Sequence, residues 1–307
     1  MSFFQTLRRS PLVGAAFLMA TSAIGPGFLT QTAVFTNQLL ASFGFIILIS
    51  VLVDIGAQMN IWRIVSASGL RAQEIANRVF PGAGHILTLM IVAGGLAFNI
   101  GNLAGAGLGL NVLTGMDVRA GALISAMISV GIFITRDAVG WMDSLSKLLG
   151  IVMIGLTLYV VYQADPPMAD ALYRSFIPEH IDVKAILTLV GGTVGGYISF
   201  AGAHRLLDSG RTGEAHLRGV NQSAVSAILL ASVMRVLLFL AALGVVSQGM
   251  SLGDSNPAAA VFRLAAGQTG YMIFGFVMWC LLSHPSSDRL ILPFRFFVPS
   301  ILFLISA

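Results

Sequence analysis

Long apolar runs alternate with short polar stretches along most of the chain. A helix needs about 20 apolar residues to cross about 30 Å of hydrocarbon, and most of the runs approach that length. The pattern therefore predicts an all-α polytopic membrane protein, with no soluble domain between the spans. The eight predicted spans are 12–35, 40–61, 86–113, 121–135, 145–162, 185–203, 220–246 and 270–282, and a weaker ninth run is 290–306.

The composition agrees with this pattern. Apolar residues make up 56% of the 307 residues and charged residues 10%, whereas a soluble domain carries about 25% charged residues. The single cysteine, Cys280, excludes a disulfide framework and a cysteine-based metal cluster. The 34 glycines indicate close helix–helix packing in lipid. The net charge of +4 is small, and we expect no nucleic acid among the partners.

Basic residues alternate between the two ends of the predicted spans. The positive-inside rule places the richer side in the cytoplasm, so the N-terminus is expected to be cytoplasmic and the loop 165–184 external. Short loops and the lack of a targeting signal suggest a bacterial inner membrane. The richer side holds Arg8, Arg9, Arg63, Arg71, Arg78, Arg136, Lys147, Arg205, Arg211, Arg218 and Arg289, and the other side holds Arg119, Arg174, Lys184 and Arg263.

Two predicted spans contain sequences that are hard to keep helical. The first span has Gly-Pro-Gly at 25–27, and the sixth has two glycine pairs, at 191–192 and 195–196. Proline removes a helical hydrogen bond and glycine favours other backbone conformations. On this basis the predicted substrate-binding residues are Gly25, Pro26, Gly27, Phe28, Gly195, Gly196 and Tyr197.

The first and sixth spans occupy corresponding positions of two halves. Paired interruptions of this kind indicate an inverted repeat, with the substrate at the unwound segments. Unwound backbone cannot face lipid, because its unpaired polar groups need a polar cavity or a ligand. A proline kink and a glycine-rich packing face remain the alternative interpretation.

Four polar residues inside predicted spans are candidates for a transport pathway or for coupling. Asp54 lies in the second span and Arg235 in the seventh, and charges at such positions are costly and commonly functional. Asn99 and Asn102 lie three residues apart on one face of the third span. The alternatives are a buried ion pair between Asp54 and Arg235, and interhelical hydrogen bonds made by the two amides.

No enzyme motif is present. The chain has no HExxH, Walker loop or zinc spacing. His204 and Asp208 close the sixth span, but no nucleophile turn precedes them. We therefore expect no catalytic residues and no cofactor.

The framework resembles the Nramp family of divalent metal transporters, in a branch depleted of metal ligands. The resemblance covers about residues 11–280. Where the family has Asp-Pro-Gly-Asn on its first helix, this chain has Gly-Pro-Gly-Phe at 25–28, and where it has Met-Pro-His-Asn on its sixth, this chain has Gly-Gly-Tyr-Ile at 195–198. On the third helix, Asn99 and Asn102 take the places of two family carboxylates.

The resemblance implies a LeuT-like inverted-repeat bundle with discontinuous helices 1 and 6, alternating access and a site between those helices. The family's aspartate, asparagine and methionine ligands map onto Gly25, Phe28 and Gly195, so a charge, an amide oxygen and a soft thioether are lost. Amides at 99 and 102 cannot exchange a proton near neutral pH. We expect a carrier of a metal ion, of divalent type, without the family's proton coupling. No residue is assigned as a metal ligand.

Two alternatives stay open. The cargo could be a small neutral or zwitterionic organic solute, for which Phe28 and Tyr197 are suitable lining residues. The chain could also be a non-transporting, truncated membrane protein, because the Pro- and Phe-rich segment 283–307 is unlike the family at that position.

The expected division is a first repeat at 1–164, a partial second repeat at 165–282 and an atypical tail at 283–307. The expected partners are the transported ion or solute and the lipid bilayer, and the oligomeric state is left open.

Overall fold

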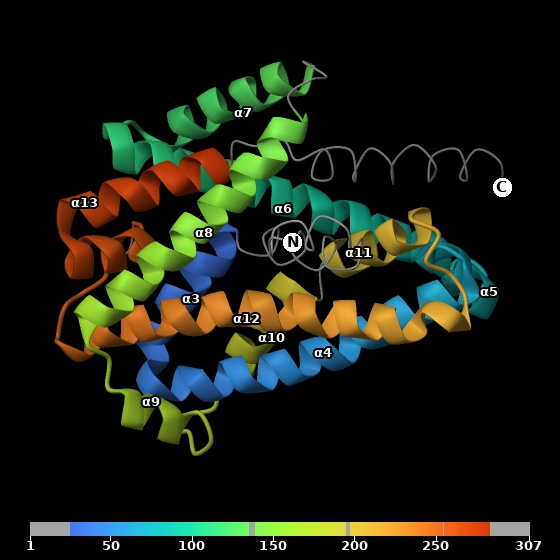
Figure 1. Cartoon of the computed structure of the whole chain (residues 1–307), viewed down its shortest axis with the longest axis horizontal. Coiled ribbons are helices and arrows are strands. Elements are labelled where there is room, and N and C mark those ends of the chain that lie inside the picture. Colours follow the sequence, from blue (N-terminus) through green and yellow to red (C-terminus); the bar gives the residue numbers. More distant parts are fainter. Residues whose placement is uncertain (1–24, 135–138, 195–196, 254, 283–307) are drawn as a thin grey trace, which may run out of the picture.

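The computed structural model describes residues 25–134, 139–194, 197–253 and 255–282, and every regular element in these residues is helical (Figure 1). The start of the first predicted span, Gly195, Gly196, the tail 283–307 and the ninth run lie outside them. The helices are α3 (Pro26–Leu39), η1 (Leu40–Ser42), α4 (Phe43–Ser68), α5 (Ala72–Val79), α6 (Ala83–Thr114), α7 (Val118–Ile134), α8 (Val139–Ala164), α9 (Met168–Arg174), α10 (Val183–Thr193), α11 (Tyr197–Asp208), η3 (Glu214–His216), α12 (Leu217–Ser247) and α13 (Pro257–Leu282).

Within the described residues, four helical segments are long and apolar enough to cross a bilayer. A fifth is added if α8 and α9, which are bent by 109°, are counted as one broken span, and Val118–Val130 is a shorter apolar helix. Three segments agree with the predicted third, sixth and seventh spans, and the other covers the second span together with the described end of the first. The four are Gly27–Ser68, Ala83–Thr114, Glu214–Ser247 and Val183–Asp208, whose range includes 195–196 outside the described residues.

The eighth predicted helix begins earlier than expected. Its predicted start at residue 270 is wrong, because α13 begins at Pro257, where proline suits the first turn of a helix. Gly267 has φ 66° and ψ −163° inside α13, so the helix is kinked there. That kink divides the apolar run, and the part before it also carries Arg263.

Glycine residues end two of the long helices. α4 stops at Gly69 and α6 at Gly115, with φ values of 66° and 74°. Their amides donate to Val65 at 3.1 Å and to Asn111 at 2.8 Å. Glycine adopts this left-handed conformation without the clash that a Cβ atom causes, so the sequence fixes where each helix stops.

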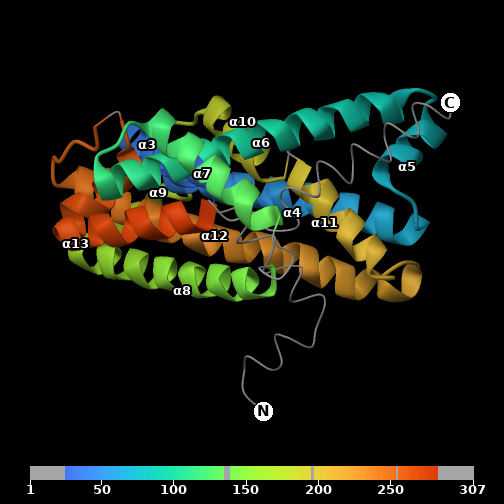
Figure 2. The ribbon, with the colours of Figure 1, turned by 90° about the horizontal axis from the view of Figure 1, so that it is seen from above.

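Helix α3 lies inside the bundle. It contacts α12, α13, α6 and α10, while α12 packs along α4 and α13 packs along α6 (Figures 1 and 2). Phe28 and Leu29 of α3 join Leu238 of α12 and Phe262 of α13 in the largest buried apolar cluster. The residues that follow the Gly-Pro-Gly sequence are therefore placed at the centre of the molecule.

Small residues bring α6 and α13 into close contact. A Cβ atom on Gly109 would lie 2.6 Å from the Trp279 amide nitrogen and 2.8 Å from the Gly275 carbonyl oxygen. A Cβ atom on Gly275 would in turn lie 2.3 Å from Val112 Cγ1. These glycines act as packing residues, as expected for helices in lipid.

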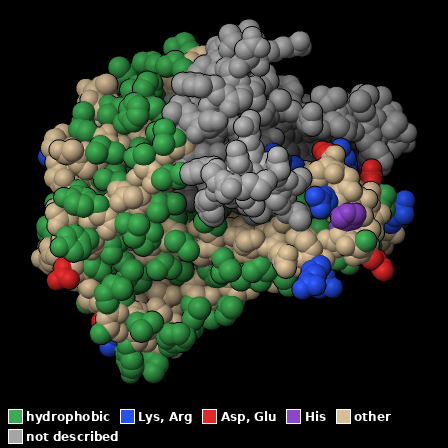
Figure 3. Space-filling view, viewed as in Figure 1, with side chains coloured by type: hydrophobic (Ala, Val, Ile, Leu, Met, Phe, Trp, Pro, Cys, Tyr) green, Lys and Arg blue, Asp and Glu red, His purple; other side chains and the backbone are tan. Residues whose placement is uncertain are grey.

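On the face in Figure 3, the charged side chains of the described residues gather mainly at one end of the molecule. Apolar side chains cover much of the face in Figure 3, while Lys, Arg, Asp, Glu and His side chains gather at the end where α5 and η3 lie. At that end, His204 Nε2 accepts a hydrogen bond from the Ala72 amide at 3.1 Å, and Arg71 pairs with Asp208 at 3.4 Å. His204 and Asp208 thus join α11 to α5.

Candidate functional site

The first predicted interruption is the beginning of helix α3. Gly25 precedes the helix in an extended conformation, with φ −101° and ψ 179°, and Pro26 occupies the first turn. No side chain caps this end. Pro26 has no backbone N–H and needs no hydrogen-bond partner there. The next backbone N–H groups in the first turn of a helix have no acceptor inside the helix. Phe28, in the same turn, is buried.

The second predicted interruption lies between α10 and α11. Helix α10 ends at Thr193 and α11 begins at Tyr197, with 195–196 outside the described residues. The glycine pair at 191–192 is helical, so the interpretation of both pairs as unwound backbone is wrong for this one. Gly192 instead allows close packing, because a Cβ atom there would lie 3.2 Å from Gln31 Oε1 of α3.

Helix α6 connects the two interruptions. A Cβ atom on Gly25 would lie 3.2 Å from Asn102 Oδ1 and 3.9 Å from the Phe98 ring. The Phe98 ring packs edge-on against Tyr197, with centroids 5.3 Å apart. Asn102 is buried, whereas Asn99 is half-buried and donates from Nδ2 to the Gly95 carbonyl at 2.9 Å. The structure therefore places Gly25 beside Asn102 and Tyr197 beside Phe98, both on α6, while Asn99 is bonded to its own helix.

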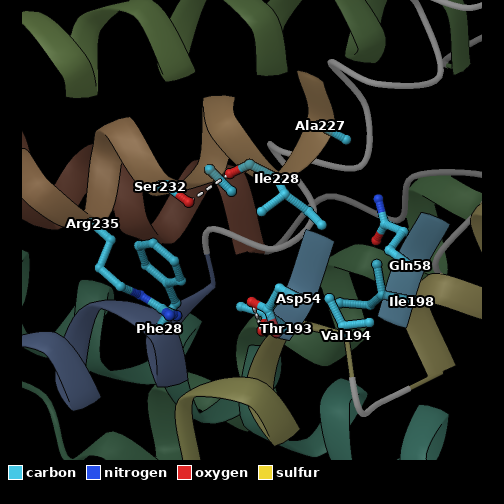
Figure 4. Close-up of a pocket in the computed structure, with 11 residues that line it drawn as sticks. Phe28, Asp54, Gln58, Thr193, Val194, Ile198, Ala227, Ile228, Ser232 and Arg235 are labelled. Carbon is cyan, nitrogen blue, oxygen red and sulfur yellow. Dashed lines mark hydrogen bonds between the residues drawn. The ribbon is translucent and has the colours of Figure 1, made fainter. Parts of the chain in front are cut away.

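A pocket opens beside this meeting point (Figure 4). The volume open to the centre of a water molecule is about 30 Å³. A single buried water needs about 10–15 Å³ of such volume, so there is room for about two water molecules. The pocket is lined by Phe28, Asp54, Gln58, Thr193, Val194, Ile198, Ala227, Ile228, Ala231, Ser232 and Arg235.

Both charged candidates line this pocket. Asp54 and Arg235 are each only 2% exposed. Asp54 Oδ2 accepts a hydrogen bond from Thr193 Oγ1 at 2.6 Å, and the Arg235 guanidinium carbon lies 4.2 Å from the centre of the Phe28 ring. Figure 4 shows Arg235 reaching from α12 to Phe28, with Asp54 and Thr193 beside one another.

The two charges do not form the direct ion pair considered from the sequence. No carboxylate of the described residues lies within 4.0 Å of the Arg235 nitrogens. Within the same residues, Asp54 Oδ1 and the Nε and Nη2 atoms of Arg235 are buried without a hydrogen-bond partner. Buried charged groups without partners are costly, so these atoms are available to a ligand.

Three polar residues that line the pocket, Gln58, Thr193 and Ser232, were not predicted. Gln58 lies four residues after Asp54 on α4, and its Nε2 donates to the Ala224 carbonyl at 3.0 Å. Spacing of four residues places two side chains on one helix face, so this signal was present in the sequence. Thr193 gave no such signal, because its bond to Asp54 joins residues 139 positions apart in the chain.

The donor set is poor in metal ligands. Among the residues that the structure describes, no three His, Cys, Asp or Glu side chains lie close enough together to hold a metal ion. Asp54 is the one carboxylate that lines the pocket, and Arg235 balances its charge. A cation bound there would rely mainly on neutral oxygen atoms.

Comparison with known proteins decides the family. The chain matches the Nramp family, described as natural resistance-associated macrophage protein-like, over residues 16–281. The chain belongs to the Nramp family. The resemblance seen in the sequence is thereby confirmed, and the Nramp family is one of membrane transporters rather than enzymes.

This Nramp protein has close relatives in two bacteria. It is 61% identical over 274 residues to an uncharacterized membrane protein of Haemophilus influenzae, covering 89% of this chain and 69% of that protein. It is 60% identical over 270 residues to the uncharacterized membrane protein YcsG of Bacillus subtilis, covering 88% and 67%. These relatives agree with an integral membrane protein.

Solved structures identify the fold. A manganese transporter of Eremococcus coleocola, bound to an aromatic bis-isothiourea compound, superposes with a TM-score of 0.63 at 18% identity, covering 99% of this chain and 72% of that one. A mutant of the same transporter gives a TM-score of 0.62 at 16% identity, covering 95% and 70%. The expected LeuT-like architecture is therefore confirmed.

Proposed function

We propose that this Nramp protein is a carrier that works by alternating access and binds its cargo in the pocket between α3, α4, α10, α11 and α12. The observation that carries the proposal is a pair of buried, incompletely bonded charges, Asp54 and Arg235, that line one pocket beside the first turn of α3 and the end of α10. Charges at membrane depth are retained where they face a cavity or a transport route. Interrupted helices at such a site allow one group of helices to move against the other.

Family membership favours a metal ion as cargo. The structurally similar Eremococcus protein is a manganese transporter. Asp54 Oδ1 is a free anionic ligand in the pocket, and unwound carbonyls with water would supply the other ligands. Asn102 has an amide where the family has a carboxylate, so transport would proceed without the family's proton coupling. Hydrated Mg²⁺ would tolerate the absent methionine best.

The charge balance of the pocket favours the second cargo class, a small zwitterionic organic solute. Arg235 places a fixed positive charge in the same cavity as Asp54, and a divalent cation would be repelled by it. A zwitterionic solute could pair its negative group with Arg235 and its positive group with Asp54. Phe28 and Ile198 supply the apolar lining that sites for organic ligands use.

Uptake into liposomes separates these cargo classes. The purified chain is reconstituted with a pH dye inside, and uptake of Mn²⁺, Mg²⁺ and a neutral amino acid is measured. Metal uptake without acidification supports an uncoupled metal carrier, and amino-acid uptake alone supports the organic solute. Absence of flux in this chain and in the longer Haemophilus influenzae relative contradicts the carrier proposal and supports a non-transporting membrane protein.

We also propose a bacterial inner-membrane location with the α5 end in the cytoplasm. Arg63, Arg71 and Arg78 lie on α4, the adjoining loop and α5, whereas α9 carries Asp170 with one arginine. An excess of basic residues marks the cytoplasmic side of a membrane protein.

A further inference from the structure

We infer that the pocket selects a small carboxylate that also carries an N–H donor, of the α-amino-acid class, held by Arg235 and Asp54. The inference rests on the proposed carrier function, because it concerns the same pocket, and it chooses between the two cargo classes. Its basis is the set of buried polar atoms that the described protein leaves unpaired around one cavity.

The unpaired atoms of Arg235 form one binding edge. Its Nε–H and one N–H of Nη2 point in the same direction from the planar guanidinium, which matches the two oxygens of a carboxylate. These two nitrogens lack a hydrogen-bond partner among the described residues. The Phe28 ring packs against the guanidinium at 4.2 Å, and such packing on a face leaves in-plane hydrogen bonds available.

Asp54 supplies the complementary acceptor. Its Oδ2 is engaged by Thr193, while Oδ1 is buried and unpaired. A ligand with an N–H group or an ammonium group can donate to Oδ1 while its carboxylate occupies the Arg235 edge. A zwitterion brings no net charge into the pocket, whereas a divalent cation adds two positive charges beside a guanidinium.

The pocket also limits the size of the ligand. In this conformation it holds about two water molecules, since the volume open to a water centre is about 30 Å³. Ile198, Ala227, Ile228 and Ala231 line much of the remainder with apolar groups. The two other polar side chains, Gln58 and Ser232, already donate to backbone carbonyls of their neighbours. This pocket volume is smaller than any amino acid, so binding requires the pocket to widen, and glycine and L-alanine require the least widening.

Binding to the purified full chain in lipid nanodiscs tests the inference. Tritiated glycine and L-alanine are measured directly, and acetate, methylamine and MnCl₂ are added as competitors. We expect glycine or alanine to bind, and acetate, which lacks the N–H donor, to compete about tenfold more weakly or worse, as for the loss of one charge-assisted hydrogen bond. Methylamine and Mn²⁺ should not displace the amino acid.

Two substitutions assign the two ends of the ligand. Arg235→Lys keeps the positive charge but removes the two parallel N–H donors of the guanidinium. It should weaken amino-acid binding about tenfold or more. Asp54→Asn should weaken glycine binding by a similar factor and leave acetate binding unchanged or stronger. The matched control is Arg263→Lys, because Arg263 is exposed on α13 and lies 5.5 Å from the Tyr271 ring; binding should be unaffected.

The outcomes separate this inference from the carrier proposal. Amino-acid binding that is unchanged in Arg235→Lys overturns the inference. Mn²⁺ binding without amino-acid binding also overturns it, although Mn²⁺ uptake would still support the carrier proposal. Specific amino-acid binding without uptake into liposomes supports the inference and overturns the carrier. If Arg235→Lys does not fold, as judged by size-exclusion chromatography, the opposite responses of glycine and acetate to Asp54→Asn decide the matter.

Discussion

At the residue scale, Phe28 and Arg235 are two pocket residues in direct contact. The resemblance predicts that Gly25 and Phe28 take the places of an aspartate and an asparagine of the Nramp family. The guanidinium carbon of Arg235 lies 4.2 Å from the centre of the Phe28 ring. The positive charge near the start of α3 is therefore a side chain of the protein. If the predicted correspondence holds, a ring that packs on an arginine stands where the family has an amide oxygen.

The Phe28–Arg235 contact makes a first prediction. We expect Phe28→Leu to lower the free energy of unfolding by about 2 kcal/mol, the size of a cation–π contact away from water. Thermal unfolding of the purified protein in detergent measures this. Tyr271→Leu removes the ring beside exposed Arg263 and should cost about 0.5–1 kcal/mol. Equal losses for the two variants would contradict a special role for the buried pair.

Restoring the missing charge makes a second prediction. Gly25→Asp returns the carboxylate that the family has at this place, and we expect it to create or strengthen Mn²⁺ binding in isothermal titration calorimetry. The new Cβ atom would lie 3.2 Å from Asn102 Oδ1, so the amide must shift by a few tenths of an ångström. Gly27→Asp is the control, since Gly27 is exposed with open space around it. Unchanged heats for Gly25→Asp would place the site elsewhere.

At the scale of elements, the apolar pattern predicted the helices better than their interruptions. It located the long helices because lipid demands a sustained apolar length. It misjudged the start of α13 because the kink at Gly267 divides the run. It also treated 191–192 as unwound, although glycine in a membrane helix equally permits close packing, here against Gln31. Sequence alone does not separate these two uses of glycine.

The contact between α6 and α13 makes a third prediction. Gly109→Ala places a methyl group 2.6 Å from the Trp279 amide nitrogen, where backbone atoms cannot move aside easily. We expect a loss of about 1–3 kcal/mol in the free energy of unfolding, as for overpacking of a core. Gly101→Ala on the same helix has open space, and alanine there should be neutral or stabilising by up to about 1 kcal/mol. Thermal unfolding of both variants compares them, and a neutral Gly109→Ala would contradict the packing role.

At the scale of the whole molecule, the fold was predictable and the pocket was only partly so. Composition and periodicity indicated a membrane bundle, and the motif framework indicated the family. The candidate residues Phe28, Asp54 and Arg235 were each visible as polar or aromatic residues in unusual places. Their meeting was not visible, because it joins α3, α4 and α12 with Thr193 of α10. Long-range contacts of this kind depend on packing that a single sequence does not reveal.

The separation of charge along the molecule makes a last prediction. α5 and α9 lie at opposite ends of the bundle (Figure 1), and the end with more arginines should face the cytoplasm. A cysteine in place of exposed Arg78 on α5, or of exposed Asp170 on α9, can be labelled in intact spheroplasts with a membrane-impermeant maleimide, in a Cys280→Ser background. We expect Asp170→Cys to react in intact cells and Arg78→Cys to react only after permeabilisation. The reverse pattern would contradict the proposed orientation.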